Sequence, residues 1–209
     1  MPFVQLNAVA SRMTHGGAGT FDIDLTTGNG IECRSGGASG DYTVIFTFAS
    51  PLTSVDSASV TSGTGSVTTS NIDNNDAHDY IVNLTGVTNT QVLKLGLTNV
   101  TDSAGDFNSA VSTSMGVLIG DTTGNGAVNS SDIAQTQSQS GQPVTSSNFR
   151  EDVTVNGLIN SSDVALVQSM SGTGLPPQGG TAPVSVTQLS TSRTKNIASP
   201  RTSRRSTNF

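Results

Sequence analysis

The chain has 209 residues, of which 11% are charged and 4% are aromatic, and its formal net charge is −6. All 15 acidic residues lie within residues 1–172, whereas residues 173–209 carry five basic residues and no acidic one. An acidic body repels nucleic acid and attracts cations, so we expect no nucleic-acid partner. No stretch approaches the ~20 consecutive apolar residues of a membrane-spanning helix, so we expect no membrane span.

Residues 3–118 alternate between apolar and polar side chains, as β-strands with one buried face do. The clearest strand segments are 19–25, 41–48, 79–87 and 91–100. Short strands at this spacing, separated by Gly- and Asn-rich turns, predict a mainly β fold with two packed sheets. The Asp-x-x-Gly turn from Asp102 to Gly105 resembles the turn before the last strand of bacterial immunoglobulin-like domains. We therefore expect an Ig-like β-sandwich, with a jelly roll as the alternative.

Two segments beyond residue 119 repeat one another. Residues 120–141 align without gaps on residues 151–172, and 13 of the 22 positions are identical. Both segments place Gly at the sixth position of a 12-residue acidic loop, where a calcium loop turns sharply. A helical pattern follows each loop, and Gly141 and Gly172 are expected to end the two helices.

Calcium binds six to eight oxygen atoms, and such a loop supplies them from positions 1, 3, 5, 7, 9 and 12. The predicted ligands of the first loop are Asp121, Thr123, Asn125, the Ala127 carbonyl, Asn129 and Asp132. Those of the second are Asp152, Thr154, Asn156, the Leu158 carbonyl, Asn160 and Asp163. We expect up to two calcium ions, and we expect Val128 and Ile159 to pair and so couple the loops.

The duplicated loops, each ending in an Asn-Ser-Ser-Asp run, resemble type I dockerins over about 53 residues. This resemblance implies two helices, each preceded by a calcium loop, and a setting in extracellular polysaccharide breakdown. It also implies docking to a cohesin-type protein in either of two orientations. The residues that it assigns to partner contact are Ser130, Ser131, Ser161 and Ser162.

The sequence departs from the dockerin pattern at two places. Thr stands at loop position 3 and Asn at position 5, so each loop carries two carboxylates rather than three. Fewer charges predict weak calcium binding, towards the ~10⁻⁴–10⁻³ M of extracellular modules. Where the family tends to carry a Lys-Arg pair, this chain has Gln137–Ser138 and Gln168–Ser169.

Other candidate sites are better explained structurally. The single cysteine, Cys33, cannot form an internal disulfide, and we expect it to be a small buried residue. The acidic cluster in residues 71–79 reads as a polar turn, and His15 as a loop residue. Asp22 and Asp24 alternate with apolar residues, so they are expected on a solvated face rather than as a catalytic pair.

These patterns predict three parts: a β-sandwich at 1–119, a dockerin-like repeat pair at 120–172 and a disordered basic tail at 173–209. No catalytic constellation appears, so we expect a non-catalytic binding or anchoring module. Carbohydrate is a second candidate ligand. The alternatives are a structural or adhesive surface protein and a fragment of a polysaccharide-degrading enzyme.

We expect an extracellular or cell-surface location. The N-terminal segment has no basic region followed by a long apolar core, which is the pattern of a signal peptide. We therefore expect this chain to be part of a longer secreted protein.

Overall fold

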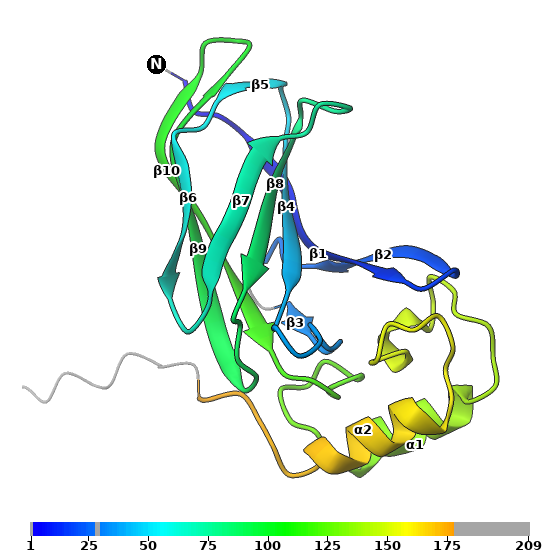
Figure 1. Ribbon diagram of the computed structural model, residues 1–209. Helices are drawn as coiled ribbons and strands as arrows, with labels where there is room; N and C mark the ends of the chain where they lie inside the picture. Colours follow the sequence, from blue (N-terminus) through cyan, green and yellow to red (C-terminus); the bar gives the residue numbers. More distant parts are fainter. Residues whose placement is uncertain (1, 28–29, 178–209) are drawn as a thin grey trace, which may run out of the picture. The chain divides into compact units, whose positions relative to one another are not determined.

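Two five-stranded β-sheets account for most of the structure. The computed structural model describes residues 2–27 and 30–177. The first sheet has the order β2-β1-β4-β8-β7 (Figure 1). Its strands are β1 (Leu6–His15), β2 (Gly19–Asp24), β4 (Tyr42–Phe48), β7 (Ser66–Ile72) and β8 (Asp79–Thr85).

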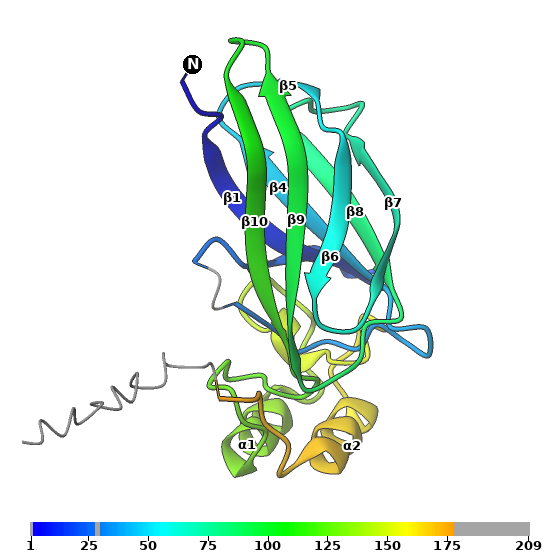
Figure 2. The same ribbon diagram turned by 90° about the vertical axis from the view of Figure 1, so that its left-hand side faces the viewer.

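The second sheet has the order β3-β10-β9-β5, and β6 also pairs with β9. Its strands are β3 (Ile31–Glu32), β5 (Leu52–Ser54), β6 (Ser57–Ser62), β9 (Gln91–Asp102) and β10 (Phe107–Val117). Strand β3 runs parallel to β10, and the other pairs are antiparallel. Figure 2 shows β10, β9 and β6 in front, with β1, β4, β8 and β7 behind them.

One hydrophobic core lies between the sheets. Val44 and Phe46 of β4 belong to the same buried cluster as Leu93 and Leu95 of β9, and each is at most 1% exposed. Apolar side chains two residues apart therefore face inward from both sheets, as strand geometry requires. The prediction of a mainly β, sandwich-like fold is confirmed. The turn from Asp102 to Gly105 precedes β10, and Gly105 has a φ of 81°.

Two ten-residue helices follow the repeated loops: α1 (Ser130–Gln139) and α2 (Ser161–Met170). They lie side by side in Figure 2, and α2 lies in front of α1 in Figure 1. Gly141 and Gly172 come two residues after the helices end and have φ values of 84° and 87°. The helices end as predicted just before these glycines, but the backbone leaves the helical conformation one residue earlier, at Ser140 and Ser171, whose ψ values are 127° and 136°. A short 3₁₀ helix, Phe149–Glu151, precedes the second loop.

The loops are coupled differently from the prediction. Val128 does not pair with Ile159; its amide donates to Thr173 O, while its carbonyl accepts from Gly172 N, both at 2.9 Å. Ile159 O accepts from Gly141 N at 2.8 Å. Each loop is therefore bonded to the chain that leaves the helix of the other repeat. The sequence could not show this exchange, because the bonded residues lie in different repeats and no local pattern links them.

The sheets and the paired repeats belong to one compact unit, Met1–Gln178. Residues 31–35 contact both repeats: Gly120 N donates to Cys33 O at 2.9 Å, and Ser35 N donates to Val153 O at 2.8 Å. The predicted tail begins at residue 173, yet Leu175 N donates to Gly126 O within the first loop. The rest of that tail, from residue 178, lies outside the described residues.

Among the described residues, no helix has the length and apolar character needed to cross a membrane.

Candidate cation site in the paired loops

The first carboxylate of the first loop is held by the loop's own backbone. Asp121 Oδ1 accepts from Asn125 N at 3.0 Å, and its Oδ2 accepts from Gly126 N at 2.8 Å. These bonds fold the loop around the carboxylate. The sixth position has a φ of 87° in both loops, at Gly126 and Gly157. The predicted sharp turn at the sixth position is confirmed, because only glycine adopts this conformation without steric cost.

The last carboxylate of the loop also begins the following helix. Asp132 Oδ2 accepts from Asn129 N at 2.9 Å, which completes a capping box with Asn129 as the N-cap. Its other oxygen, Oδ1, accepts from the amide and the hydroxyl of Thr123, at 3.0 and 2.9 Å. The Thr123 hydroxyl also lies 3.3 Å from Asp121 Oδ1. One oxygen of each carboxylate thus converges on a hydroxyl that has a single proton.

The second loop repeats this geometry. Asp163 Oδ1 accepts from the amide and hydroxyl of Thr154, at 3.0 and 2.8 Å, and its Oδ2 accepts from Asn160 N. Asp152 Oδ1 lies 3.5 Å from the same hydroxyl. Gly157 N donates to Asp152 Oδ2 at 2.9 Å. The near identity of two loops 31 residues apart indicates that this convergence follows from the repeated sequence.

The four loop aspartates are buried without a cationic side chain. Asp121, Asp132, Asp152 and Asp163 are each 0% exposed. Within the described part of the chain, neither Lys nor Arg forms a salt bridge with any of them. Buried carboxylates cost free energy unless they are paired or bound to a cation. A cation between the two Oδ1 atoms of each loop would supply the missing positive charge.

The donor atoms are those that hard cations prefer. Each loop offers carboxylate, hydroxyl, amide and carbonyl oxygens, which suit Ca²⁺. The described residues contain no group of three or more His, Cys, Asp or Glu that could hold a metal ion. Each loop contributes two carboxylates, so neutral oxygens would have to supply the remaining calcium ligands.

The predicted asparagine ligands fall into two classes. Asn125 and Asn156, at position 5, each accept one bond from the backbone amide two residues on, at 2.9 Å. An amide oxygen has two lone pairs, so these two keep one for a cation. At position 9, Asn129 Oδ1 accepts from both the amide and the hydroxyl of Ser131, and Asn160 does the same with Ser162. The side-chain oxygens of Asn129 and Asn160 therefore cap the helices. This leaves positions 1, 3, 5, 7 and 12 of each loop as the candidates for direct calcium ligands.

The residues assigned to partner contact are exposed. Ser130, Ser131, Ser161 and Ser162 form the first turns of α1 and α2, and all four are open to solvent. They lie directly after the capping asparagines, so the loops fix their positions. Equivalent surfaces are available on both repeats.

Sequence analysis missed a buried histidine that reaches the second loop. His15, the last residue of β1, is 0% exposed rather than a loop residue, and its Nδ1 lies 2.9 Å from Asp152 Oδ2. Its Nε2 lies 3.2 Å from Arg34 Nη1. A guanidinium only donates hydrogen bonds, so Nε2 accepts and Nδ1 carries the proton. His15 is thus a neutral donor to Asp152.

Arg34 is neutralised by a second buried acid. Its Nη2 lies 2.7 Å from Glu32 Oε2, and both side chains are fully buried. Burial alone would raise the pKa of Glu32, but the charge of Arg34 and bonds from Arg34 and Ser11 outweigh it and lower that pKa. Arg34 also lies 5.4 Å from the ring centre of Phe149. The result is a buried polar chain from the sheets to the second loop.

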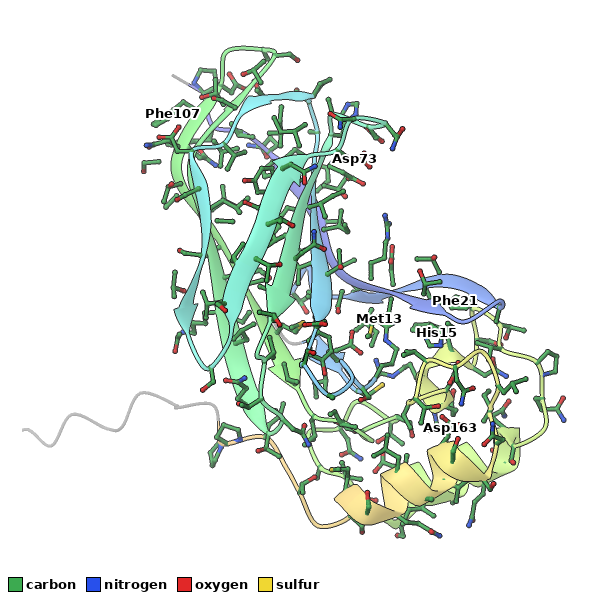
Figure 3. All side chains as sticks on the ribbon, in the orientation of Figure 1. Met13, His15, Phe21, Asp73, Phe107 and Asp163 are labelled. Atoms are coloured by element: carbon green, nitrogen blue, oxygen red, sulfur yellow. The ribbon has the colours of Figure 1, made fainter. Side chains whose placement is uncertain are left out.

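Aromatic rings enclose this chain. Phe21 of β2 stacks on Phe149 with ring centres 5.3 Å apart, and His15 meets Phe21 edge-on at 5.3 Å. Figure 3 shows His15 and Phe21 next to each other on the β1–β2 hairpin. The rings exclude water, which strengthens the enclosed hydrogen bonds.

The remaining candidates show structural roles. Burial raises the pKa of the Cys33 thiol to about 12, and its Sγ donates to Arg150 O. A thiol with this pKa stays protonated at neutral pH, so it is not a nucleophile. Asp22 pairs with Arg12 at 2.8 Å on a partly exposed face. In the acidic cluster, Asp76 bonds to His78 at 2.8 Å within an exposed turn.

Val155 at position 4 of the second loop has a φ of 51°, whereas the same position of the first loop is Gly124, with a φ of 72°. A β-branched residue in this region is strained by roughly 1–3 kcal/mol. We predict that Val155→Gly raises the free energy of unfolding by about 1 kcal/mol after the entropic cost of glycine. Denaturant unfolding measures this. The matched control, Gly124→Val, should destabilise the chain; a destabilised Val155→Gly variant would contradict the assignment.

The low pKa of Glu32 makes part of the stability depend on pH. A carboxyl whose pKa is lowered by folding stabilises the fold above its ordinary value and loses that contribution as pH falls through the folded value. We predict that Glu32→Gln costs about 3–5 kcal/mol at pH 7, because Arg34 loses its buried partner. The gap should shrink under acid conditions, where Glu32 itself takes up a proton. Asp22→Asn, at the exposed pair, should cost no more than about 1 kcal/mol. Equal losses for the two variants at pH 7 would refute this account.

Comparison with known proteins identifies no relative of this chain. The sequence matches no family model, and neither the curated proteins nor the solved structures provide a match. What the chain does is therefore inferred from the two loops, the buried chain that reaches them and the surface around them.

Proposed function

We propose that this chain is a non-catalytic extracellular module in which residues 120–172 form a dockerin-like, calcium-binding anchor attached to an Ig-like sandwich. One observation carries the proposal: in each loop, two buried carboxylates direct one oxygen each at a shared threonine hydroxyl. Backbone amides of the same loop donate to both oxygens of each carboxylate. This arrangement leaves negative charge concentrated at one point in each loop.

Asp121, Thr123, Asn125 and Asp132 would hold calcium in the first loop, together with the Ala127 carbonyl. Asp152, Thr154, Asn156, Asp163 and the Leu158 carbonyl would do so in the second. Bound calcium supplies positive charge and fixes the loop that begins each helix. Two carboxylates per loop correspond to weak sites, of order 10⁻⁴–10⁻³ M, which fill where calcium is abundant, as outside cells.

The strand order supports an Ig-like assignment for the sandwich. In that fold, strands ABED form one sheet and CFG the other. Here β1-β4-β8-β7 and β6-β9-β10 follow these orders when β1, β4, β6, β7, β8, β9 and β10 are taken as A, B, C, D, E, F and G. Strand β3 pairs with β10 as a second part of strand A.

The partner surface supports anchoring through a cohesin-type protein. An exposed pair of serines begins each helix, so either repeat can present the same small, polar surface. Glutamine and serine replace the basic pair usual in dockerins, so the partner must tolerate a neutral surface. The link to polysaccharide breakdown follows from the dockerin resemblance and is part of this proposal.

A groove whose lining includes hydroxyl and amide groups favours carbohydrate as a second ligand. The groove has a volume of about 710 Å³ and runs over β1, β2, β4, β7 and β8. Its lining includes Thr43, Asn83 and Thr85, whose side chains form cross-strand hydrogen bonds. Fixed hydroxyl and amide groups in a cavity of this size suit a polyhydroxylated ligand. The alternatives remain an adhesive surface protein, in which calcium only stiffens the C-terminal part, and a fragment of a polysaccharide-degrading enzyme.

Calcium should stabilise the folded chain. At about 10 mM calcium, each site should add roughly 1.4–2.7 kcal/mol for dissociation constants of 10⁻³–10⁻⁴ M. Thermal unfolding with calcium, and after chelation, measures the gain. Asp132→Asn with Asp163→Asn should abolish it, because each loop loses a converging charge.

The matched control is Asp56→Asn with Asp76→Asn, at exposed aspartates outside the loops, which should keep the full calcium effect. Sodium chloride at equal ionic strength should not reproduce the gain. An unsubstituted chain that melts identically with calcium and with chelator would rule out the metal assignment.

Docking should require at least one of the two exposed serine pairs. Against a panel of cohesin domains, we predict calcium-dependent capture that survives Ser131→Arg or Ser162→Arg alone, because the other repeat still presents its surface. The double variant should lose capture. Ser62→Arg, on the exposed face of β6, is the control. Capture of the double variant would exclude the serine surface as the docking site. Capture in chelator would exclude calcium-dependent docking.

A further inference from the structure

The β1–β2 hairpin makes a close backbone approach to the second loop. A Cβ atom on Gly16 would lie 2.3 Å from Asn156 O, and one on Gly157 would lie 2.8 Å from His15 O. Only residues without a side chain allow two backbones to approach in this way. The hairpin is therefore fitted to the loop, and His15 enters at the point of closest approach.

His15 holds one oxygen of a proposed calcium ligand. Asp152 Oδ2 accepts from both His15 Nδ1 and Gly157 N, at 2.9 Å each. With Oδ2 engaged twice, Oδ1 is the oxygen that faces Thr154 and Asp163. Arg34 in turn occupies His15 Nε2, which keeps the donating proton on Nδ1.

The first loop lacks an equivalent partner. Among the described residues, every hydrogen bond to the Asp121 carboxylate comes from its own loop, from Thr123, Asn125 and Gly126. The nearest cation, Arg150, donates to the backbone oxygens of Asp121 and Thr122 instead. Two loops that share 8 of their 12 residues therefore differ in what surrounds the aspartate at position 1.

We propose that His15 is a positioning residue for the second calcium site, so that the sandwich completes this site and makes it the tighter of the two. The inference rests on calcium binding by the loops. A hydrogen bond from outside the site orients a ligand before the metal arrives, and removal of such partners typically weakens metal binding about 10–100-fold. The isolated repeat pair would lose this contribution at the second loop alone.

Calcium titration calorimetry on the full chain, one loop at a time, tests this. Asp132→Asn leaves the second loop as the calcium site, and Asp163→Asn leaves the first. In the Asp132→Asn background, His15→Leu should weaken calcium binding by about tenfold or more. His15→Asn should recover most of the affinity, because its amide nitrogen lies as many bonds from the backbone as Nδ1 and also donates. In the Asp163→Asn background, neither His15 substitution should change calcium affinity.

Three results would overturn the inference. His15→Leu could leave the second loop unchanged, which would remove the positioning role. Both loops could weaken equally, which would indicate general destabilisation. His15→Asn could bind as poorly as His15→Leu, which would assign the effect to ring packing. In all three cases the loops still bind calcium and the proposed function stands, whereas an unsubstituted chain that takes up no calcium would refute both.

Discussion

A carboxylate removed from water must receive hydrogen-bond donors or a positive charge, and this constraint shapes the part of the protein where sheets and repeats meet. Glu32 meets it with Arg34, which lies on the same short segment. The loop aspartates meet it with backbone amides, which donate to both oxygens of each carboxylate, but within the described residues neither Lys nor Arg pairs with them. The first arrangement balances buried charge within the protein, whereas in the proposed function a cation would balance the second.

The loop conformation is maintained at a cost. Position 4 adopts left-handed backbone in both repeats, although the second repeat has Val155 where the first has Gly124. The donors around Asp152, including His15 and Gly157, hold the second loop in that conformation. A strained residue that persists in this way is typical of sites whose geometry is over-determined by their surroundings. The repeat that carries the strain is also the one whose first aspartate accepts a hydrogen bond from a side chain of the sandwich.

The repeated sequence gives the two loops similar conformations, whereas contact with the sheets gives them different surroundings. Asp121 and Asp152 occupy the same position of the repeat, yet only Asp152 receives a side chain from the sheets. His15, Arg34 and Glu32 form a continuous buried chain behind it, within aromatic rings that exclude water. The first repeat follows β10 directly along the chain, and this buried chain of side chains joins the second repeat to the sheets as well.

The sequence by itself determined the strands, the repeat and the loop turns, because these follow from periods of two residues, identity at a fixed shift and glycine at fixed positions. It also contained an unused signal: His15 lies three alternations after Val9, on the inward side of β1. Only the tertiary structure decided what His15 meets, since Asp152 is 137 residues away. It also decided that Val128 bonds beyond α2 rather than to Ile159. Local patterns constrain neighbours along the chain, whereas these contacts depend on how distant segments pack.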